Sequence, residues 1–551
     1  MRDGVRLATD VYLPDGWDRG PTVLVRLPYG KRDRYTFMPQ CAPWFNDRGY
    51  AFVVQDVRGK GESEGSTDHI VHEVPDGYDT LEWIVRSGWS NGAVGMFGDS
   101  YYAYTQWAAL ASGHEALRAI VPRMSSLRIP TDEDQDAEAQ QTGTGASGPN
   151  PARDDGIGRP PSAAWARYLA GYWLDNDEHM PPMELSDPPM AAFEEFFTRI
   201  GKRSSAFDSV FPRAVSRFPF PDGHPVQHRA VPTLHVLGWF DPVAKAGMET
   251  YLKLTAHPAW APLQHLSADA TDHENYQLSD APARDGNDHG TDDEALARLL
   301  PRYLGPALDF FDVYLAGTAS PDTLPRVRWT LGHVGDFDGD QWPPREAVQA
   351  ELFLDGLEQS REDVGLLTPH PPTQASVGRW NHDPRKPVPD IGDSLAILET
   401  WPDESDTGRR QDVLAFDGPV AEHAVDIVGP VELELTVASS RPSMDVFVKL
   451  FDVEPDGTAR RLLSDQITVS RVNESAVTTS MELGHIAYRL QPGHRLRMHV
   501  ASSESPTFLH DPGVDGNRWL TQTSSVSRQQ LLTSPDRPSR LVYMQLPHPT
   551  S

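Results

Sequence analysis

The stretch VGMFGDSYYAYTQWAAL, residues 94–110, decides the fold. A run of buried-type residues ends at Gly98, and a helical pattern begins directly after Ser100. A strand that passes through a sharp turn into a helix places the turn serine at the carboxyl edge of an α/β sheet, as in a nucleophile elbow. The general G-x-S-x-G pattern is not met in full, because Tyr102 stands at its last position and the next small residue is Ala103. A serine at a helix start is also a common helix cap, so the strand–turn–helix context, and not the motif alone, favours Ser100 as a nucleophile.

Strand-like and helix-like segments alternate on both sides of this turn. The strand-like segments are short apolar and β-branched runs, namely VRLATDVYLP, PTVLVRLPYG, YAFVVQDV, VPTLHVLGWFD and APLQHLSADA. Apolar residues at helical spacing lie between them, and a long amphipathic helix over ALARLLPRYLGPALDFFDVYLAG ends the series. This alternation predicts a mainly parallel sheet with helices packed on it. We expect the resulting α/β domain to comprise residues 1–124 and 232–325.

Two further regions depart from this alternation. Residues 125–231 contain a polar, Gly/Pro-rich stretch with the acidic run DEDQDAE, followed by the aromatic helical segments SAAWARYLAGYWLDN and MAAFEEFFTRIGKR. We expect a helical cap inserted into the α/β domain, with the acidic run as a solvated face. Residues 326–551 contain period-two segments such as VRWTLGHV, VELELTVASS and HRLRMHVASS. Many short strands with turn residues between them predict an antiparallel, all-β jelly roll.

Length and composition exclude several classes of function. The 551 residues suffice for about three domains at roughly 100–200 residues each. A net charge of −30 repels phosphate backbones, so no nucleic-acid partner is expected. The single cysteine, Cys41, excludes an intrachain disulfide and a Cys-rich zinc or iron–sulfur site, and its setting in MPQCAPWF predicts helix-side packing. No run reaches the ~18 apolar residues of a membrane span and no apolar segment of a secretory signal is visible, so a cytoplasmic protein is expected.

A series of motifs extends along most of the chain, outside the region around 125–230. They are DGVRLATDVYLPDG, VRLPYGKRD, GYAFVVQDVRGKGESEG, DGYDTLEWI, NGAVGMFGDSYYAYTQWAA, GWFD, FFDVYLAG, VDIVGPVELELTVASS, MDVFVKLFDVEPDG and LQPGHRLRMHVASSESP. In this order they resemble the CocE/NonD-type serine hydrolases, which include cocaine esterases, α-amino-acid ester hydrolases, glutaryl-cephalosporin acylases and X-prolyl dipeptidyl peptidases. The resemblance implies an α/β-hydrolase domain with an inserted helical cap, followed by a jelly roll, and a nucleophile at Ser100.

An acyl-transfer serine needs a base and an acid that orients it, in the α/β-hydrolase chain order Ser, Asp or Glu, His. Asp241 is the first acid after the strand VPTLHVLGWF and matches the W-x-D position of the family, although it could also cap the following helix. His273 follows the next strand and is the predicted base. The family usually has G-P-W-x-H there, and only the histidine is present. His265 would lie inside that strand and His289 lies in an acidic loop, so both are weaker candidates.

The oxyanion of an acyl-transfer reaction needs hydrogen-bond donors. The backbone N–H of Tyr101, the residue after the nucleophile, is the general first donor. The resemblance implies the second, because the family uses a tyrosine hydroxyl from an N-P-Y motif whose last two residues match Pro28 and Tyr29. Tyr29 could instead be a packed aromatic ring. Asp99 raises the alternative of an aspartate nucleophile of the haloalkane-dehalogenase type, but it lies one residue before the elbow position that Ser100 occupies.

These features predict a serine hydrolase that cleaves an ester, or an amide, of a small acyl substrate through an acyl-enzyme. The resemblance favours ester over peptide cleavage, since the X-prolyl peptidases usually carry extra N-terminal structure. Acyl transfer, X-prolyl-type peptide cleavage with the same triad, and a degenerate binding protein are the alternatives. No metal, organic cofactor or membrane partner is implied, and the sequence is compatible with a homo-oligomer.

Overall fold

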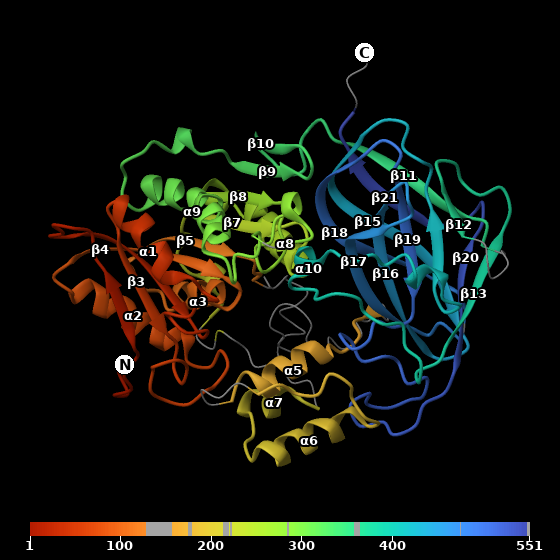
Figure 1. The fold of residues 1–551 in the computed structure, drawn as a ribbon, viewed down its shortest axis with the longest axis horizontal. Coiled ribbons are helices and arrows are strands. Elements are labelled where there is room, and N and C mark those ends of the chain that lie inside the picture. The colour runs from red at the N-terminus through yellow and green to blue at the C-terminus, as the bar shows by residue number, and fades with distance from the viewer. Residues whose placement is uncertain are drawn as a thin grey trace.

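The chain forms two sheets with a group of helices beside them (Figure 1). The computed structural model describes residues 1–127, 157–174, 179–212, 220, 223–283, 286–357, 364–473 and 475–547. The acidic run DEDQDAE lies outside these residues, so its predicted role as a solvated face stays a prediction. Helices α5, α6 and α7 lie below both sheets in the view of Figure 1.

The first sheet has nine strands in the order β1-β3-β2-β4-β5-β7-β8-β9-β10. Its strands are β1 (Thr9–Tyr12), β2 (Gly20–Leu27), β3 (Ala51–Asp56), β4 (Ser90–Asp99), β5 (Leu117–Arg123), β7 (Thr233–Gly238), β8 (Gln264–Asp269), β9 (Val327–Leu331) and β10 (Gly335–Gly339). The inner pairs are parallel, and the outermost strands β1 and β10 pair antiparallel. Every residue of β3 and of β7 is buried, as a parallel sheet covered on both faces requires.

Helices cover both faces of this sheet. They are α1 (Met38–Asp47), α2 (Glu73–Arg86), α3 (Ser100–Ala111), α8 (Ala244–Ala256) and α9 (Asp293–Tyr314). One apolar cluster joins α1 and α9 to the sheet, and a second cluster joins α2, α3 and the end of α8 to it. Cys41 lies in the first cluster, buried on α1, so its predicted packing role is confirmed. The predicted α/β architecture is confirmed as well.

The inserted segment is helical, as predicted. Its elements are the two-residue strand β6 (Ile157–Gly158) and the helices α5 (Ala163–Gly171), α6 (Pro189–Ile200) and α7 (Ser205–Val210). Aromatic and aliphatic residues of these helices form one cluster with Tyr101 of α3 and with Leu509 and Trp519 of the C-terminal part. The cap therefore packs against both of the other regions.

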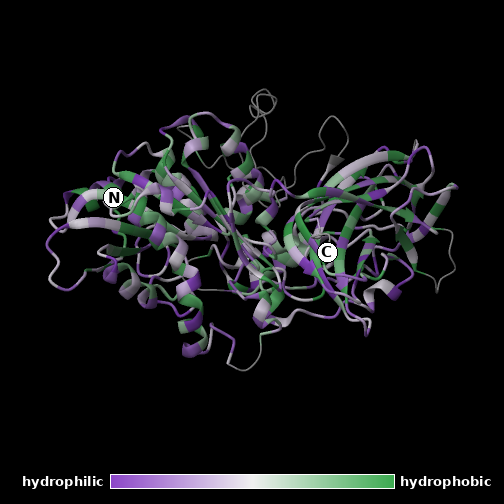
Figure 2. Cartoon of the chain, turned by 90° about the horizontal axis from the view of Figure 1, so that it is seen from above, coloured by the Kyte–Doolittle hydropathy of each residue, from purple (hydrophilic) through white to green (hydrophobic). Residues whose placement is uncertain are grey.

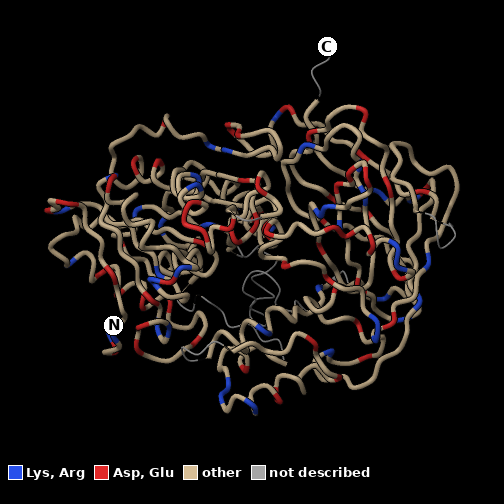
Figure 3. The backbone as a smooth tube through the Cα atoms, viewed as in Figure 1, with Lys and Arg blue, Asp and Glu red and all other residues tan. Residues whose placement is uncertain are grey.

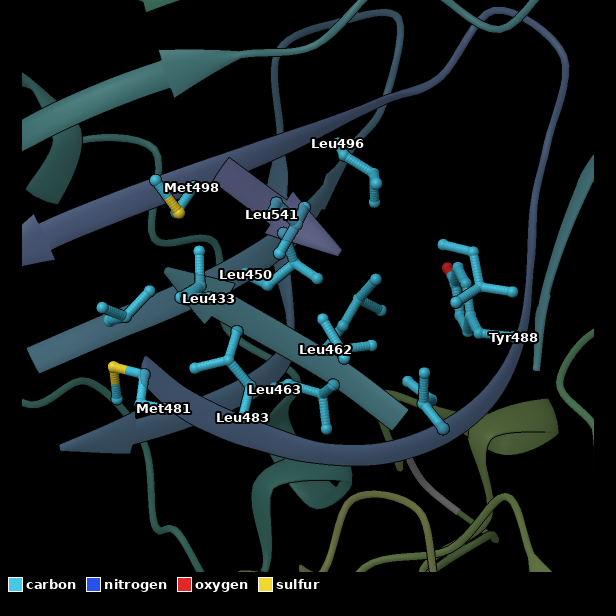
Figure 4. Close-up of a cluster of buried hydrophobic side chains, with 14 of the residues drawn as sticks. Leu433, Leu450, Leu462, Leu463, Met481, Leu483, Tyr488, Leu496, Met498 and Leu541 are labelled. Carbon is cyan, nitrogen blue, oxygen red and sulfur yellow. The ribbon is translucent and has the colours of Figure 1, made fainter. Parts of the chain in front are cut away.

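The C-terminal part is an antiparallel β-sandwich with few helices, as predicted. Its strands are β11 (Val348–Asp355), β12 (Gly365–Thr368), β13 (Ser376–His382), β14 (Leu414–Asp417), β15 (Val425–Ser439), β16 (Ser443–Val453), β17 (Ala459–Ser470), β18 (Val477–Leu490), β19 (Arg495–Ala501), β20 (Ser527–Thr533) and β21 (Arg540–Gln545), with the short helix α10 (Ile397–Thr400) among them. Inward-facing side chains of alternate positions, such as Leu433, Leu450 and Leu483, form its core (Figure 4). Hydrophobic residues recur along the strands of both sheets (Figure 2).

One segment lies in a different sheet from the one predicted. The sequence analysis assigns VRWTLGHV to the jelly roll that begins at residue 326. Its strand β9 pairs instead in parallel with β8, and β10 extends the same sheet. Period-two alternation is common to half-buried strands of both domains, so the pattern does not distinguish between them. We therefore propose that the C-terminal domain begins after Gly339, with the other expected limits kept.

The two main domains share a hydrophobic core. Trp239, which follows β7, stacks on Trp342 with ring centroids 4.9 Å apart. Both belong to the apolar cluster that fills the C-terminal sandwich. Acidic and basic residues are interspersed over both domains (Figure 3). No helix in the described part of the chain is long and apolar enough to cross a membrane.

Candidate active site

The predicted nucleophile, Ser100, stands at the sharp junction between β4 and α3. Its φ of 52° lies in the left-handed region that residues other than glycine rarely adopt. Gly98 has a φ of 142°, and a Cβ added there would lie 2.0 Å from the Tyr102 ring, so no larger residue fits. Asp99 is buried, whereas Ser100 is partly exposed. A partly exposed serine on a strained strand-to-helix turn has the geometry of a nucleophile elbow.

A hydrogen bond joins the other two residues of the predicted triad. His273 Nδ1 lies 3.0 Å from Asp241 Oδ1. The side chain of Asp241 is fully buried and that of His273 is 10% exposed. Asp241 Oδ1 also accepts a hydrogen bond from the N–H of Val243 at 2.9 Å, closing the turn that leads into α8. Asp241 thus makes the turn contact expected at a helix start and the contact expected of an orienting acid.

The sheet order brings the three positions to one edge. Strands β4, β7 and β8 are parallel, and Ser100, Asp241 and His273 each follow the carboxyl end of one of them. The loop and the turn are also in direct contact, because Asn275 Nδ2 donates a hydrogen bond to Asp99 Oδ2 at 3.2 Å. Catalytic groups of α/β folds gather at this edge of the sheet.

The environment of His273 favours proton acceptance. Burial disfavours the imidazolium, but the charge and the hydrogen bond of Asp241 act in the opposite direction and raise the pKa of His273 to about 9. Glu274 and Asp99 raise the pKa further by their negative charge. With Nδ1–H held by Asp241, the other ring nitrogen, Nε2, is the one that can take a proton from a hydroxyl group.

Tyr29 lies beside the nucleophile turn. Its ring centroid is 6.2 Å from that of Tyr102 in the first turn of α3. Its hydroxyl lies 3.3 Å from the hydroxyl of Tyr168 on α5, and Tyr172 donates a hydrogen bond to the carbonyl of Pro28 at 2.8 Å. Burial and the neighbouring tyrosines raise the pKa of Tyr29 well above its ordinary value, so its hydroxyl keeps the proton that a donor needs.

Tyr101 combines a fixed side chain with a backbone N–H at a helix start. The first N–H groups of a helix have no acceptor within the helix, so they can bind a negative charge. The Tyr101 hydroxyl donates to Glu73 Oε1 at 2.9 Å and accepts from the N–H of Ile70 at 3.2 Å. Glu73 in turn pairs with the buried Arg26 at 2.9 Å. This buried group fixes the residue whose N–H is the predicted donor.

The two alternative histidines occupy structural positions. His265 lies inside β8, with Nδ1 2.9 Å from the carbonyl of Pro325 and Nε2 3.0 Å from the hydroxyl of Tyr314. Both nitrogens are therefore engaged. His289 packs edge-on against Phe37 and beside Tyr276, and burial lowers its pKa. Neither histidine has a carboxylate partner of the kind that Asp241 provides for His273.

Several residues of this region are not indicated by the sequence. Tyr35 donates a hydrogen bond to Glu274, next to His273, at 3.0 Å. The carboxylate of Asp272 accepts from the N–H of Tyr276 and from that of Leu398 on α10, each at 2.9 Å. The contact between α10 and Asp272 depends on the packing of the C-terminal domain, so no local pattern in the sequence indicates it. Tyr168 and Tyr172 do have a signal in the sequence, because their spacing of four residues puts them on one face of a predicted helix.

No group of three or more His, Cys, Asp and Glu side chains within the described ranges is arranged to hold a metal ion. The site contains a serine at an elbow, a histidine bonded to a carboxylate, and Tyr29, whose ring packs against Tyr102 in the first turn of α3. Such an arrangement can carry out nucleophilic acyl transfer. The individual catalytic roles remain predictions.

Comparisons with known proteins cover nearly the whole chain. Residues 3–275 match the family described as X-Pro dipeptidyl-peptidase (S15 family), and residues 319–542 match the X-Pro dipeptidyl-peptidase C-terminal non-catalytic domain. A cocaine esterase from Rhodococcus sp. (strain MB1 Bresler) is 30% identical over 98% of this chain and 96% of its own.

Solved structures share the fold. An α-amino acid ester hydrolase has a TM-score of 0.77 and an aminopeptidase from the marine sediment archaeon Thaumarchaeota archaeon has a TM-score of 0.76, each at 22% identity over 99% of this chain and 95% of the other. Both structures share with this chain an α/β domain that contains a helical insertion and is followed by a β-sandwich. Together with the near full-length similarity to the esterase, these findings show that the chain belongs to the CocE/NonD family of serine hydrolases, whose catalytic region is that of peptidase family S15.

Proposed function

We propose that this chain hydrolyses esters of small acyl substrates through a covalent acyl-enzyme. Ser100 Oγ attacks the ester carbonyl while His273 Nε2 takes the hydroxyl proton. Asp241 holds the imidazole in the required orientation and stabilises its cation. The protonated His273 then gives the proton to the leaving alcohol, and water enters by the reverse sequence to release the acid. The 3.0 Å hydrogen bond between His273 and Asp241, at the sheet edge that bears Ser100, is the observation that carries this proposal.

The negative charge on the carbonyl oxygen is held by two donors. We assign these to the backbone N–H of Tyr101 and to the hydroxyl of Tyr29. The raised pKa of Tyr29 supports the assignment, because a phenol that stays protonated can donate throughout the reaction. The hydroxyl of Tyr168, 3.3 Å from that of Tyr29, helps to orient it.

Ester cleavage is preferred to peptide cleavage on the similarity to cocaine esterase, which covers 98% of the chain at 30% identity. Acyl transfer to an alcohol or amine would use the same acyl-enzyme, with a different acceptor in place of water. Product analysis with and without added nucleophile distinguishes the two reactions. The bonded His273–Asp241 pair argues against a degenerate binding protein, because such a protein has no need for it.

A fluorophosphonate probe tests the proposal directly. The probe reacts with a serine hydroxyl only where a base activates it, so mass spectrometry should locate one adduct, on Ser100. The variants Ser100→Ala and His273→Ala should not be labelled, whereas the control His265→Ala should be labelled like the wild type. An adduct on another serine, or ester turnover without labelling of Ser100, would refute the proposal.

A further inference from the structure

Asp99, Arg123 and Asn275 form a closed ring of hydrogen bonds beside the site. Arg123 Nε donates to Asp99 Oδ1 at 2.6 Å, and Asn275 Nδ2 donates to Asp99 Oδ2 at 3.2 Å. Arg123 Nη2 completes the ring by donating to Asn275 Oδ1 at 2.9 Å. The three residues are 5%, 4% and 6% exposed, respectively. Charged and amide groups so deeply buried are stable only with their partners in place, so the ring fixes the relative positions of its members.

The ring joins the two segments that bear the proposed nucleophile and base. Asp99 is the last residue of β4 and immediately precedes Ser100. Arg123 is the last residue of β5 and is in register with Asp99 in the parallel pair. Asn275 follows His273 by two residues, in the loop after β8. The ring therefore spans from the serine strand to the histidine loop across the intervening strands.

Tyr303 of α9 supports the ring from outside the loop. Its hydroxyl donates to Asp99 Oδ2 at 3.0 Å, and its ring lies under the guanidinium of Arg123, 4.1 Å from the ring centroid. Asp99 thus accepts three hydrogen bonds. A carboxylate occupied in this way is not a nucleophile, which removes the aspartate-nucleophile alternative and leaves Asp99 with a different task.

The histidine loop is held on its opposite side by the C-terminal domain. Glu274 N donates to the carbonyl of Leu395 at 3.2 Å, and Asp272 accepts from the N–H of Leu398 at 2.9 Å. The His273–Asp241 bond orients the imidazole ring, but it does not set the separation between the loop and β4. Asn275, with a φ of 67°, is the residue through which the loop reaches Asp99.

We propose that Asp99, Arg123 and Asn275 are positioning residues, which set the separation of His273 from Ser100. The inference rests on the proposed function, since it assumes that these two groups exchange a proton. A base must lie within hydrogen-bond reach of the hydroxyl that it deprotonates, and a displacement of about 1 Å can cost roughly 100-fold in rate. The ring acts through His273 and touches no substrate.

The test compares Asn275→Gly with Tyr303→Phe. Each variant deletes one hydrogen bond to the same oxygen, Asp99 Oδ2. Asn275→Gly also deletes the bond from Arg123, and both of its lost bonds hold the histidine loop. Glycine adopts a positive φ without strain, so Asn275→Gly removes the amide and leaves the backbone conformation available. For an ester substrate of the wild-type enzyme we expect Asn275→Gly to lower kcat about 10- to 100-fold with KM nearly unchanged. Fluorophosphonate labelling of Ser100 should slow in parallel.

The control Tyr303→Phe should keep kcat within about threefold of the wild type. Because it deletes one hydrogen bond where Asn275→Gly deletes two, its melting temperature should fall less than that of Asn275→Gly. If Asn275→Gly does not fold, Asn275→Asp replaces it, because the carboxylate still accepts from Arg123 but repels Asp99; the same loss of kcat is expected. Wild-type kcat in the folded loop variant would overturn the inference, as would an equal loss of kcat in Tyr303→Phe. Either result would leave the proposed function intact if the fluorophosphonate labels Ser100 in the wild-type enzyme. If the wild-type enzyme is not labelled at Ser100, the proposed function itself is refuted.

Discussion

The turn that bears Ser100 and the loop that bears His273 lie at the same sheet edge but are built differently. The turn is made by consecutive residues: Gly98 provides the positive φ and the space that Tyr102 requires, and α3 begins at once after β4. The loop depends on residues far away in the chain, because Asp99 binds it from one side and the α10 segment from the other.

The turn and the loop are therefore held in position in two different ways. A local turn can be strained and still form, since strand and helix on either side determine its path. A loop held by distant partners is only as well placed as the packing of those partners. The position of the base therefore depends on contacts with β4 and with the C-terminal domain, whereas the position of the nucleophile depends on the residues directly around it. The predictions that follow test this difference, in order of decreasing effect.

Removal of the nucleophile should have the largest effect. Ser100→Ala deletes one oxygen in the turn and should lower kcat by about 10⁴- to 10⁶-fold, because no other step replaces the acyl-enzyme. The melting temperature should stay near that of the wild type, because the substitution deletes a single oxygen from a partly exposed side chain. Ester turnover and thermal unfolding of one preparation measure both. Turnover within tenfold of the wild type would show that the turn is not the nucleophile site.

Removal of the base tests the loop in the same way. His273→Ala should reduce kcat by about 10⁴-fold or more, because an unactivated serine hydroxyl is a weak nucleophile. His265→Ala and His289→Ala serve as controls and should retain most activity, although His265→Ala loses two hydrogen bonds and some stability. An inactive His289→Ala beside an active His273→Ala would transfer the role of base to His289.

The sequence predicts the turn well and the loop only in part. The fold class, the cap and the position of Ser100 follow from strand–helix alternation and from one local motif, which short-range sterics determine. Chain order and resemblance predict His273 as the base, but nothing local in the sequence indicates which residues hold its loop. Asp99 and Arg123 are 24 residues apart and Asn275 is 152 residues from Arg123, so no periodicity links them. The sequence pattern assigns β9 to the wrong sheet for the same reason, since strand pairing is a long-range property.

Loss of one oxyanion donor should cost less than loss of a triad residue. Tyr29→Phe keeps the ring contacts with Tyr102 and deletes the hydroxyl, so kcat should fall about 10²- to 10³-fold with KM little changed. Tyr168→Phe is the matched control, because it deletes the hydroxyl that only orients Tyr29, and its loss should be smaller. Steady-state kinetics of both variants decide the matter. A Tyr29→Phe enzyme with wild-type kcat would exclude Tyr29 from the site.

The pH dependence of kcat/KM should reflect the protonation of His273 in the loop. His273 must be neutral to accept a proton, and its pKa is raised to about 9, so kcat/KM should rise with pH, reach half of its plateau near pH 9 and level off only above that pH. At pH 7 it should be about 100-fold below its plateau. Asp241→Asn removes the main cause of the rise and should move the inflection to lower pH, where burial dominates. A profile that is flat between pH 7 and 9 would contradict the assignment.

The same pKa shift has a consequence for stability. The pKa of His273 in the folded protein lies above its ordinary value of about 6.5. Protonated His273 therefore stabilises the folded protein, and this stabilisation is fully present below about pH 6.5. It is lost as the pH rises through about 9. Melting temperatures of the wild type and of His273→Ala, measured at pH 6 and pH 9.5, should therefore converge at the higher pH. A difference that stays constant over this range would contradict the shift.

The smallest effect is expected at Asp272, on the C-terminal side of the loop. Asp272→Asn keeps the shape but turns an amide NH₂ toward one of the two backbone N–H groups that the carboxylate accepts, so stability should fall by about 1–3 kcal/mol. The loss of kcat should stay below about tenfold, because Asp241 and Asn275 still hold the loop from its other side.

Glu274→Gln is the control for Asp272→Asn. It removes one charge from the same loop but still accepts a hydrogen bond from Tyr35, so stability and kcat should both change little. If Asp272→Asn instead lost as much kcat as Asn275→Gly, the C-terminal domain would set the position of His273 as strictly as the ring of Asp99 does, and the contrast between the two sides of the loop would have to be abandoned.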